Sequence, residues 1–400
     1  MMSARNLSKE RLGRMHDIMA GYVERGEISG MVTLVSRRED VYVDAIGKQA
    51  FGSDVSMQRD TLFRIASMTK PITAAAALIL VEECRLRLDE PVDQLLPELA
   101  DRQVLKRLDS PLDDTVPAKR AITLRDLLTF QLGIGVVMAP PGMYPIQKAM
   151  DEAGLAPGPN PPAHSPDEWM KRLGSLPLVY QPGQNWMYHT GSEILGVLIA
   201  RAADQPLEQF LHERIFEPLG MKDTGFSVPA DKLDRLPTSY MTHPDSGAPM
   251  VHDEPANSRW SSKPAFPSGG GGLVSTVDDY LAFCQMMLNK GQYGRERILS
   301  RPSIELMTID HLTAEMKANN RIFFGDHSGW GFGVAVSLKR SDLSDTPGRF
   351  GWNGGTGTSA YTDPKENMIG IVMTQRLMDS PAPPSVFLDY WTSAYQAIDD

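Results

Sequence analysis

Cysteine is scarce in this sequence: Cys84 and Cys284 are the only two among 400 residues. They lie far apart, and neither is flanked by residues at a zinc-binding spacing, which argues against a disulfide framework and against a structural metal site. Both thiols are predicted to be free and buried. No cofactor and no metal ion are expected.

Long apolar runs and an excess of positive charge are also missing. No stretch approaches the roughly eighteen apolar residues that a membrane span needs, and residues 1–10 contain no apolar run typical of a signal peptide. A cytoplasmic protein without a membrane partner is therefore expected. The chain has 40 basic and 50 acidic residues, which gives a net charge of −10, and no basic stretch is interleaved with aromatic residues. A nucleic-acid partner is not expected, and the ligand should be a small molecule.

Glycine and proline, in contrast, are abundant, with 34 and 30 residues, and they predict many loops around the regular elements. The hydrophobic fraction of 42% and the charged fraction of 22% are ordinary for a globular protein. This composition excludes a disordered or fibrous chain.

Apolar periodicity predicts strands towards both ends of the chain. Residues 12–27 fit an amphipathic helix, and two strands joined by a charged turn are expected at residues 31–36 and 41–45. Residues 368–374 are an apolar run of buried-strand length, and residues 384–398 fit a closing helix. The pattern favours one sheet assembled from both ends of the chain and interrupted by a helical insertion.

The middle of the chain is predicted to be mainly helical. Residues 67–86, 191–205 and 206–216 fit helices, and residues 99–128 are expected to be helical in pieces. The periodicity collapses over residues 133–166, which are rich in proline and glycine. A loop of that length inside a compact protein is usually functional, so this segment is predicted to lie over the active site.

One sequence motif with catalytic potential stands at the start of the alanine-rich helix. Ser67-Met68-Thr69-Lys70 is the only Ser-x-x-Lys of the chain. Three residues of a helix turn about 300° around its axis, so Lys70 lies on nearly the same face as Ser67. Its amine is therefore expected within reach of the Ser67 hydroxyl. Unpaired backbone N–H groups of the first turn can stabilise an oxyanion that forms at Ser67. The motif therefore predicts a serine nucleophile activated by a lysine.

Several further segments occur in an order and spacing that resemble the serine β-lactamase-related superfamily, which includes class C β-lactamases, DD-peptidases and the family VIII carboxylesterases. They are residues 62–70, 122–128, 181–191, 216–224 and 269–276.

The resemblance extends from about residue 12 to about residue 380, and it implies the fold. The expected class is α/β, with an antiparallel sheet flanked by helices, built from both chain ends, and an inserted mainly helical domain. We place the α/β domain at residues 1–84 and 190–400 and the helical domain at residues 85–189, with the active site in the cleft between them. The resemblance also implies that Ser67 is acylated.

The superfamily's Tyr-x-Asn element corresponds to Tyr188-His189-Thr190. The resemblance implies that Tyr188 shuttles the serine proton together with Lys70, and it leaves open which of the two is the primary base. Thr190 departs from the asparagine, which helps β-lactamases hold an amide group of the substrate, so amide recognition is in doubt. Neighbours in an extended segment point to opposite sides, and His189 is therefore expected to be structural.

The third element, Lys-Thr-Gly in the lactamases, corresponds to Trp352-Asn353-Gly354. The lysine of the family binds a substrate carboxylate, whereas an indole offers an apolar face and one uncharged N–H. A Trp-x-Gly here is similar to the family VIII carboxylesterases. These three residues are expected to contact substrate, and the N–H groups of Ser67 and Gly355 are expected to form the oxyanion hole.

Other catalytic motifs are missing: the sequence has no Gly-x-Ser-x-Gly and no His-Glu-x-x-His. Aromatic and methionine side chains could line an acyl pocket, although such residues are more often part of a core. The candidates are Met138, Met143, Tyr144, Trp169, Tyr180, Trp186, Phe323, Phe324 and Trp330.

The sequence therefore predicts a serine carboxylesterase that hydrolyses short-chain esters through an acyl-Ser67 intermediate. An acyltransferase of the same fold, which passes the acyl group to an alcohol, is the first alternative. A weak β-lactamase or D-peptidase is the second, and the uncharged Trp352 speaks against it. The natural ester, the preferred acyl chain and the oligomeric state do not follow from the sequence.

Overall fold

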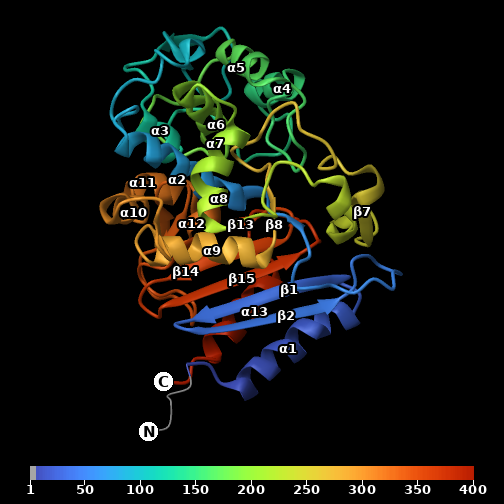
Figure 1. Cartoon of the computed structure of the whole chain (residues 1–400). Coiled ribbons are helices and arrows are strands. Elements are labelled where there is room, and N and C mark those ends of the chain that lie inside the picture. The colour runs from blue at the N-terminus through green and yellow to red at the C-terminus, as the bar shows by residue number, and fades with distance from the viewer. Residues whose placement is uncertain (1–5) are drawn as a thin grey trace.

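The computed structural model describes residues 6–400, so the first five residues of the N-terminal segment discussed above lie outside it. A seven-stranded antiparallel sheet forms one half of the molecule (Figure 1). Its strands are β1 (Gly30–Arg37), β2 (Asp40–Gly47), β11 (Ser328–Trp330), β12 (Ala335–Ser337), β13 (Phe350–Gly354), β14 (Thr358–Asp363) and β15 (Met368–Thr374).

The order of the strands joins the two ends of the chain. The sheet runs β11-β12-β13-β14-β15-β1-β2, so the last strand in sequence lies directly beside the first. Met31 of β1 faces Thr374 of β15, and Arg37 faces Met368. The predicted fold class, an antiparallel sheet built from both chain ends and flanked by helices, is confirmed.

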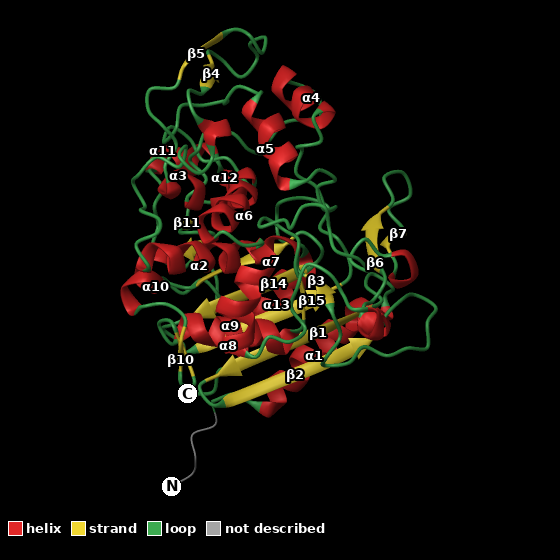
Figure 2. Cartoon of the chain, turned by 45° about the horizontal axis from the view of Figure 1, so that its top comes forward, coloured by secondary structure: helices red, strands yellow, loops and turns green. Residues whose placement is uncertain are grey.

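Side-chain alternation along β15 divides the core between the two faces of the sheet. Met368 and Val372 pack with α1 (Lys9–Glu24) and α13 (Ser385–Gln396). Ile369 and Ile371 point to the opposite face and join the larger core. Because successive side chains of a strand point to opposite faces, one apolar strand supports both layers of helices. Figure 2 shows α1, α9 and α13 against the strands of this sheet.

The remaining helices lie on the second face and beyond it, and Figure 1 shows α2 between the sheet and the upper helices. They are α2 (Thr69–Glu82), α3 (Leu124–Leu128), α4 (Pro145–Glu152), α5 (Pro166–Gly174), α6 (Thr190–Ala203), α7 (Leu207–Leu211), α8 (Glu217–Leu219), α9 (Val277–Leu288), α10 (Arg301–Met307), α11 (Ala314–Asn319) and α12 (Arg321–Phe324). Short helical turns of other types are η1 (Ala66–Met68), η2 (Pro97–Leu99), η3 (His212–Phe216), η4 (Ala230–Arg235) and η5 (Pro255–Asn257).

Four two-stranded ribbons complete the secondary structure. They pair β3 (Phe63–Arg64) with β8 (Val274–Ser275), β4 (Gln103–Leu105) with β5 (Thr115–Pro117), β6 (Ser239–Thr242) with β7 (Pro249–Asp253), and β9 (Gln292–Tyr293) with β10 (Glu296–Arg297). The ribbon β3–β8 leads directly into η1 and therefore positions the predicted nucleophile.

Some local predictions were wrong. The segment 99–128 is helical only at η2 and α3, and the ribbon β4–β5 occupies much of the rest. The predicted loop 133–166 contains α4, which begins at Pro145. Cys284 is buried as expected, whereas Cys84 is exposed, because it follows the C-terminal end of α2 with a φ of 57°.

The proposed domain boundaries at residues 84 and 190 stay a prediction. Helix α6, which follows the second boundary, packs against α2 of the predicted α/β domain and against α3 of the predicted helical domain. Among residues 6–400, no helix combines the length and the apolar character that crossing a membrane requires.

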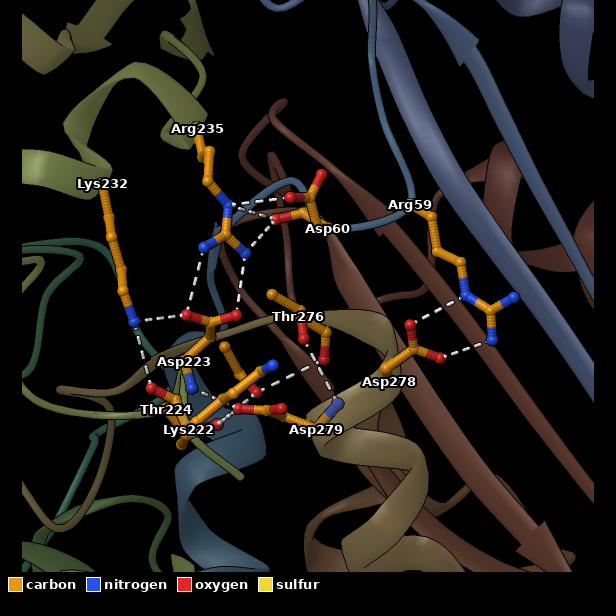
Figure 3. Close-up of polar contacts among 11 residues, drawn as sticks. Arg59, Asp60, Lys222, Asp223, Thr224, Lys232, Arg235, Thr276, Asp278 and Asp279 are labelled. Atoms are coloured by element: carbon orange, nitrogen blue, oxygen red, sulfur yellow. Dashed lines mark hydrogen bonds and ion pairs between the residues drawn. The ribbon is translucent and has the colours of Figure 1, made fainter. Parts of the chain in front are cut away.

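A polar network ties the segment before Ser67 to α9 and η4 (Figure 3). The carboxylate of Asp223 accepts hydrogen bonds from Lys232 at 2.7 Å and from Arg235 at 2.8 Å. Arg235 also donates to the carbonyl of Asp60 at 2.6 Å, three residues before β3. Burial alone would raise the pKa of Asp223, but the hydrogen bonds from Arg235 and Lys232 hold it at about 2. Asp223 is therefore an ionised group that, through Arg235, links η4 to the segment that leads into β3.

We predict that Asp223→Asn lowers the free energy of unfolding at pH 7 by about 1–3 kcal/mol, because two charge-assisted hydrogen bonds are lost. The folded-state pKa of Asp223 lies below its ordinary value, so the ionised group stabilises the protein above about pH 4 and loses this effect as the pH falls towards 2. The difference between wild type and variant should shrink over that window in urea unfolding experiments.

Asp278→Asn is the matched control, since Asp278 pairs with Arg59 in the same view and both side chains are about half exposed (Figure 3). An exposed pair contributes little, so this variant should lose less than about 1 kcal/mol. Equal losses in the two variants would contradict the prediction.

Candidate active site

Ser67 lies in η1, immediately before α2, as the motif predicts. Every residue of α2 from Thr69 to Leu80 is buried, so the helix is a rigid core element, while Ser67 at its start is half-buried. Ala66 adopts a φ of 41°, a conformation that L-residues seldom take up. The turn places the Ser67 hydroxyl at the boundary between the core and solvent.

The end of β13 and the start of β14 hold the backbone before Ser67. Thr356 Oγ1 donates to the carbonyl of Arg64, and Thr358 Oγ1 donates to that of Ile65 at 3.3 Å. Gly354 lies so close to Ile65 that a Cβ at this position would clash with the Ile65 carbonyl oxygen. The glycine therefore permits a close approach between the sheet and the turn that carries Ser67.

Lys70 is fully buried, and its Nζ is surrounded by acceptors. It lies 2.9 Å from Ser67 Oγ and 2.6 Å from the carbonyl oxygen of Gly270. Burial lowers the pKa of Lys70 to about 7, and the negative charge of Glu193 opposes the shift. A substantial fraction of the amine is then neutral near pH 7 and can accept a proton.

Tyr188 packs directly on Lys70 and is hydrogen bonded to Trp352. Lys70 Nζ lies 4.6 Å from the centre of the Tyr188 ring. Trp352 Nε1 donates to the Tyr188 hydroxyl oxygen at 2.7 Å. Burial raises the pKa of Tyr188 to about 12, although the hydrogen bond from Trp352 opposes the rise. The phenol therefore keeps its proton at neutral pH.

The expectation that His189 points away from Tyr188 was wrong. His189 adopts a φ of 82° and a ψ of −60°, so the segment is not extended at this residue. As a result, His189 Nδ1 lies 3.2 Å from Lys70 Nζ, on the same lysine that Tyr188 contacts. Burial lowers the pKa of His189, and the charge of Lys70 lowers it further. The imidazole is therefore neutral at pH 7.

Sequence reasoning missed Glu193 and the carbonyl of Gly270. Glu193 Oε1 accepts from His189 Nε2 at 2.9 Å and from Ser268 Oγ at 2.7 Å. A side chain at position 270 would crowd the Glu193 carboxylate and the His189 ring, so a larger residue there would displace at least one of them. Two signals were available: His189 and Glu193 are spaced i,i+4 at a helix start, and a run of four glycines follows Ser268.

The residues expected to contact substrate are not all on one face. Trp352 is buried against Tyr188, and Gly354 packs on Ile65. Asn353 points to the other face of β13, where its Oδ1 accepts from Ser359 Oγ at 2.7 Å. Gly355 follows β13 and is exposed, and its carbonyl accepts from the Met378 N–H at 2.8 Å.

An aromatic cluster surrounds Tyr188. It comprises Phe130, Trp186, Tyr188, Phe323, Phe324, Trp330 and Trp352. Trp186 stacks on Tyr188 with ring centroids 5.7 Å apart, and Trp330 contacts Trp352 edge-on at 4.8 Å. Of the side chains proposed for an acyl pocket, Trp186, Phe324 and Trp330 are fully buried in this cluster, so they support Tyr188 from behind. Met138 and Met143 are exposed.

Comparison with known proteins assigns the family. The sequence profile of the Beta-lactamase family matches residues 15–385. The chain belongs to the Beta-lactamase family. Its fold is similar to that of EstCE1, a hydrolase with promiscuous acyltransferase activity, at a TM-score of 0.79 and 24% identity, covering 96% of this chain and 98% of that one.

Three curated relatives of this Beta-lactamase family protein match most of its length. Protein Rv1367c of Mycobacterium tuberculosis is 39% identical, covering 89% of this chain and 88% of the relative. Esterase EstB of Burkholderia gladioli is 29% identical, with the same shares. Monacolin J acid methylbutanoyltransferase of Aspergillus terreus is 28% identical, covering 80% and 78%. The chain is thus a serine hydrolase or acyltransferase type of enzyme.

Two cavities flank the central residues of this Beta-lactamase family site. One, of about 310 Å³, lies between residues 154–163 and the side chains of His189, Thr190 and Glu193. The other, of about 440 Å³, is lined in part by Phe323 and Trp352. The proline-rich segment predicted to be functional therefore forms one wall beside His189. Thr190 is buried, and its hydroxyl has no hydrogen-bond partner within residues 6–400.

Metal binding finds no support in the described part of the chain. Within residues 6–400, no three His, Cys, Asp or Glu side chains are grouped so that they could hold a metal ion.

Gly354 and Gly355 offer a matched test of how β13 supports the site. Gly354→Ala would force a methyl group into Ile65 and Thr358, whereas nothing lies within 4 Å of a Cβ at position 355. We predict that Gly354→Ala lowers the free energy of unfolding by about 2 kcal/mol or more, and that Gly355→Ala changes it by less than about 1 kcal/mol. Urea unfolding measures both, and similar values for the two variants would contradict the packing argument.

Proposed function

We propose that this protein is a serine carboxylesterase that hydrolyses short-chain carboxylic esters through an acyl-Ser67 intermediate. The observation that carries the proposal is the uncharged indole of Trp352 bonded to Tyr188, beside a Ser67–Lys70 pair at hydrogen-bond distance. At the position of Trp352, the β-lactamases of the serine β-lactamase-related superfamily carry a lysine. Without that cation the site favours a neutral ester over an anionic lactam or peptide.

In the acylation step, Ser67 Oγ attacks the carbonyl carbon of the ester while neutral Lys70 takes the hydroxyl proton. Lys70 Nζ lies 2.9 Å from that oxygen, which suits direct proton transfer. The pKa of about 7 for Lys70 against about 12 for Tyr188 supports the lysine as the base. The N–H groups of Ser67 and Gly355 stabilise the oxyanion.

The tetrahedral intermediate then collapses, and the bond from the carbonyl carbon to the alkoxide oxygen breaks. Tyr188 gives its proton to the alkoxide, which is a stronger base than the phenolate, and Lys70 restores the phenol proton. In deacylation, a water molecule gives a proton to Lys70 and attacks the acyl carbon. The bond from the acyl carbon to Ser67 Oγ then breaks, and Ser67 Oγ takes that proton from Lys70. Each turnover therefore consumes one ester and one water molecule and releases one carboxylic acid and one alcohol.

An acyltransferase is the second candidate, in which an alcohol replaces water in deacylation. The cavity of about 310 Å³ beside His189 favours it, because this space is large enough for an acceptor next to the predicted active site. The methylbutanoyltransferase among the relatives supports the same reading. A weak β-lactamase or D-peptidase is the third candidate, and the nitrocefin assay below detects the β-lactamase activity.

The first test concerns the nucleophile. Ser67→Ala should lower turnover of a p-nitrophenyl ester by about four orders of magnitude or more while the circular dichroism spectrum stays unchanged. A fluorophosphonate should label the wild-type protein at Ser67, as peptide mass spectrometry can establish. Label at another residue, or activity that persists in Ser67→Ala, would overturn the assignment.

The second test concerns the substrate class. Leaving a substrate carboxylate unpaired costs about 2–5 kcal/mol, so kcat/KM for the best p-nitrophenyl ester should exceed that for nitrocefin by about 30-fold to several thousand-fold. Adding a short-chain alcohol separates the two candidates: an esterase releases free acid throughout, and an acyltransferase forms a new ester. Equal efficiency on nitrocefin would contradict the argument from Trp352.

A further inference from the structure

The buried amine of Lys70 has three hydrogen-bond partners, and only one of them is the predicted nucleophile. They are Ser67 Oγ at 2.9 Å, the Gly270 carbonyl at 2.6 Å and His189 Nδ1 at 3.2 Å. Gly270 offers a carbonyl oxygen, which can only accept. The function of the third partner depends on which ring nitrogen of His189 carries the proton.

Glu193 determines that tautomer. Its carboxylate accepts hydrogen bonds from His189 Nε2 at 2.9 Å, from Ser268 Oγ at 2.7 Å and from the Gly270 N–H at 3.3 Å. Burial opposes ionisation of Glu193, but the hydrogen bonds from His189 and Ser268 hold its pKa below the ordinary value. An ionised carboxylate can only accept, so His189 Nε2 carries the proton and Nδ1 presents a lone pair to Lys70.

The consequence appears when Lys70 is neutral. A neutral amine has two N–H bonds and one lone pair. The Gly270 carbonyl and His189 Nδ1 accept the two N–H groups, which leaves the lone pair for the third direction, towards Ser67. We propose that His189 and Glu193 are a positioning pair that aims the lone pair of Lys70 at the Ser67 hydroxyl. The proposal rests on the proposed function, in which Lys70 is the base.

The backbone of His189 supports this role. A φ of 82° is uncommon for a residue other than glycine and strains the backbone. The same conformation brings the side chains of both Tyr188 and His189 onto Lys70. A histidine that only filled space would not require this strained backbone conformation. Strain of this kind persists where surrounding contacts compensate for it and is concentrated at functional sites.

The neighbouring elements contribute few other ionisable groups. Lys70 on α2 faces Tyr188, His189 and Glu193, while the glycine run 269–272 and Trp352 on β13 bring no ionisable side chain. Tyr188 in turn faces Tyr361, which is half-buried and whose pKa, raised to about 12 by burial, keeps it protonated. Glu193 is therefore the one negative charge that acts on Lys70 among these groups, and its removal should lower the pKa of the lysine.

The main test is Glu193→Gln, which keeps the size of the side chain and removes its charge. We expect the plateau of kcat/KM for the p-nitrophenyl ester to fall about 10- to 100-fold, because the amide no longer fixes the His189 tautomer. The midpoint of the rising limb of the pH profile should also move to lower pH, by about half a unit to one unit. A merely structural role would lower activity without moving the midpoint, and an unmoved midpoint overturns the proposal.

Substitutions of His189 separate the acceptor from the strained backbone. His189→Gly relieves the strain but removes the acceptor, whereas His189→Asn keeps an acceptor oxygen and tolerates a positive φ. We expect kcat to fall about 10- to 100-fold in His189→Gly with little change in KM, and to recover in part in His189→Asn. Equal kcat values in the two variants overturn the proposal, and this comparison decides it alone if Glu193→Gln does not fold.

A second histidine–carboxylate pair serves as the control. His16 Nδ1 lies 2.7 Å from Asp44 Oδ2 on the far face of the sheet, and His16→Gln should leave kcat/KM and its pH midpoint unchanged. Ser67→Ala distinguishes failure of the proposed function from failure of the positioning pair alone. Activity in Ser67→Ala refutes the proposed function itself, whereas an inactive Ser67→Ala together with unaltered Glu193→Gln refutes only the positioning pair.

Discussion

A fully buried amine governs the arrangement of this molecule. Removing the charge of Lys70 from water is costly, and the protein compensates with acceptors and with a lowered pKa. Those acceptors come from three separate segments: the turn before α2, the glycine run after Ser268, and the start of α6. The three segments must pack tightly around α2 for the lysine to be tolerated at all. Core packing and catalytic geometry are therefore the same constraint here.

The same burial acts in opposite directions on the two partners of the serine. It disfavours the charged form of each group, which lowers the pKa of Lys70 to about 7 and raises that of Tyr188 to about 12. The aromatic cluster around Tyr188 provides that dry environment, and the Trp352 N–H orients the hydroxyl. One environment thus separates the pKa values of the two groups, and under the proposed function Lys70 acts as the base and Tyr188 as the acid without a second cation near the tyrosine.

The sequence allowed the sheet at both chain ends to be predicted, because β1 and β15 are apolar runs of strand length. It also allowed Ser67 and Lys70 to be paired, since their spacing on a helix is fixed by geometry. The place of His189 could not be predicted, because its positive φ comes from tertiary packing and leaves no local signal. The ribbon β4–β5 was missed for a related reason: strands of three residues are too short for periodicity to reveal.

The position of β15 between β14 and β1 has a consequence for synthesis on the ribosome. The hairpin of β1 and β2 is made early, but β15 (Met368–Thr374), which pairs with β1 on its other side, follows more than 300 residues later in the chain. Until then β1, which is buried along its whole length in the folded protein, has an unpaired edge. The sheet therefore cannot close until β15 has been made, and the growing chain carries an edge that is open to intermolecular pairing for all of that time.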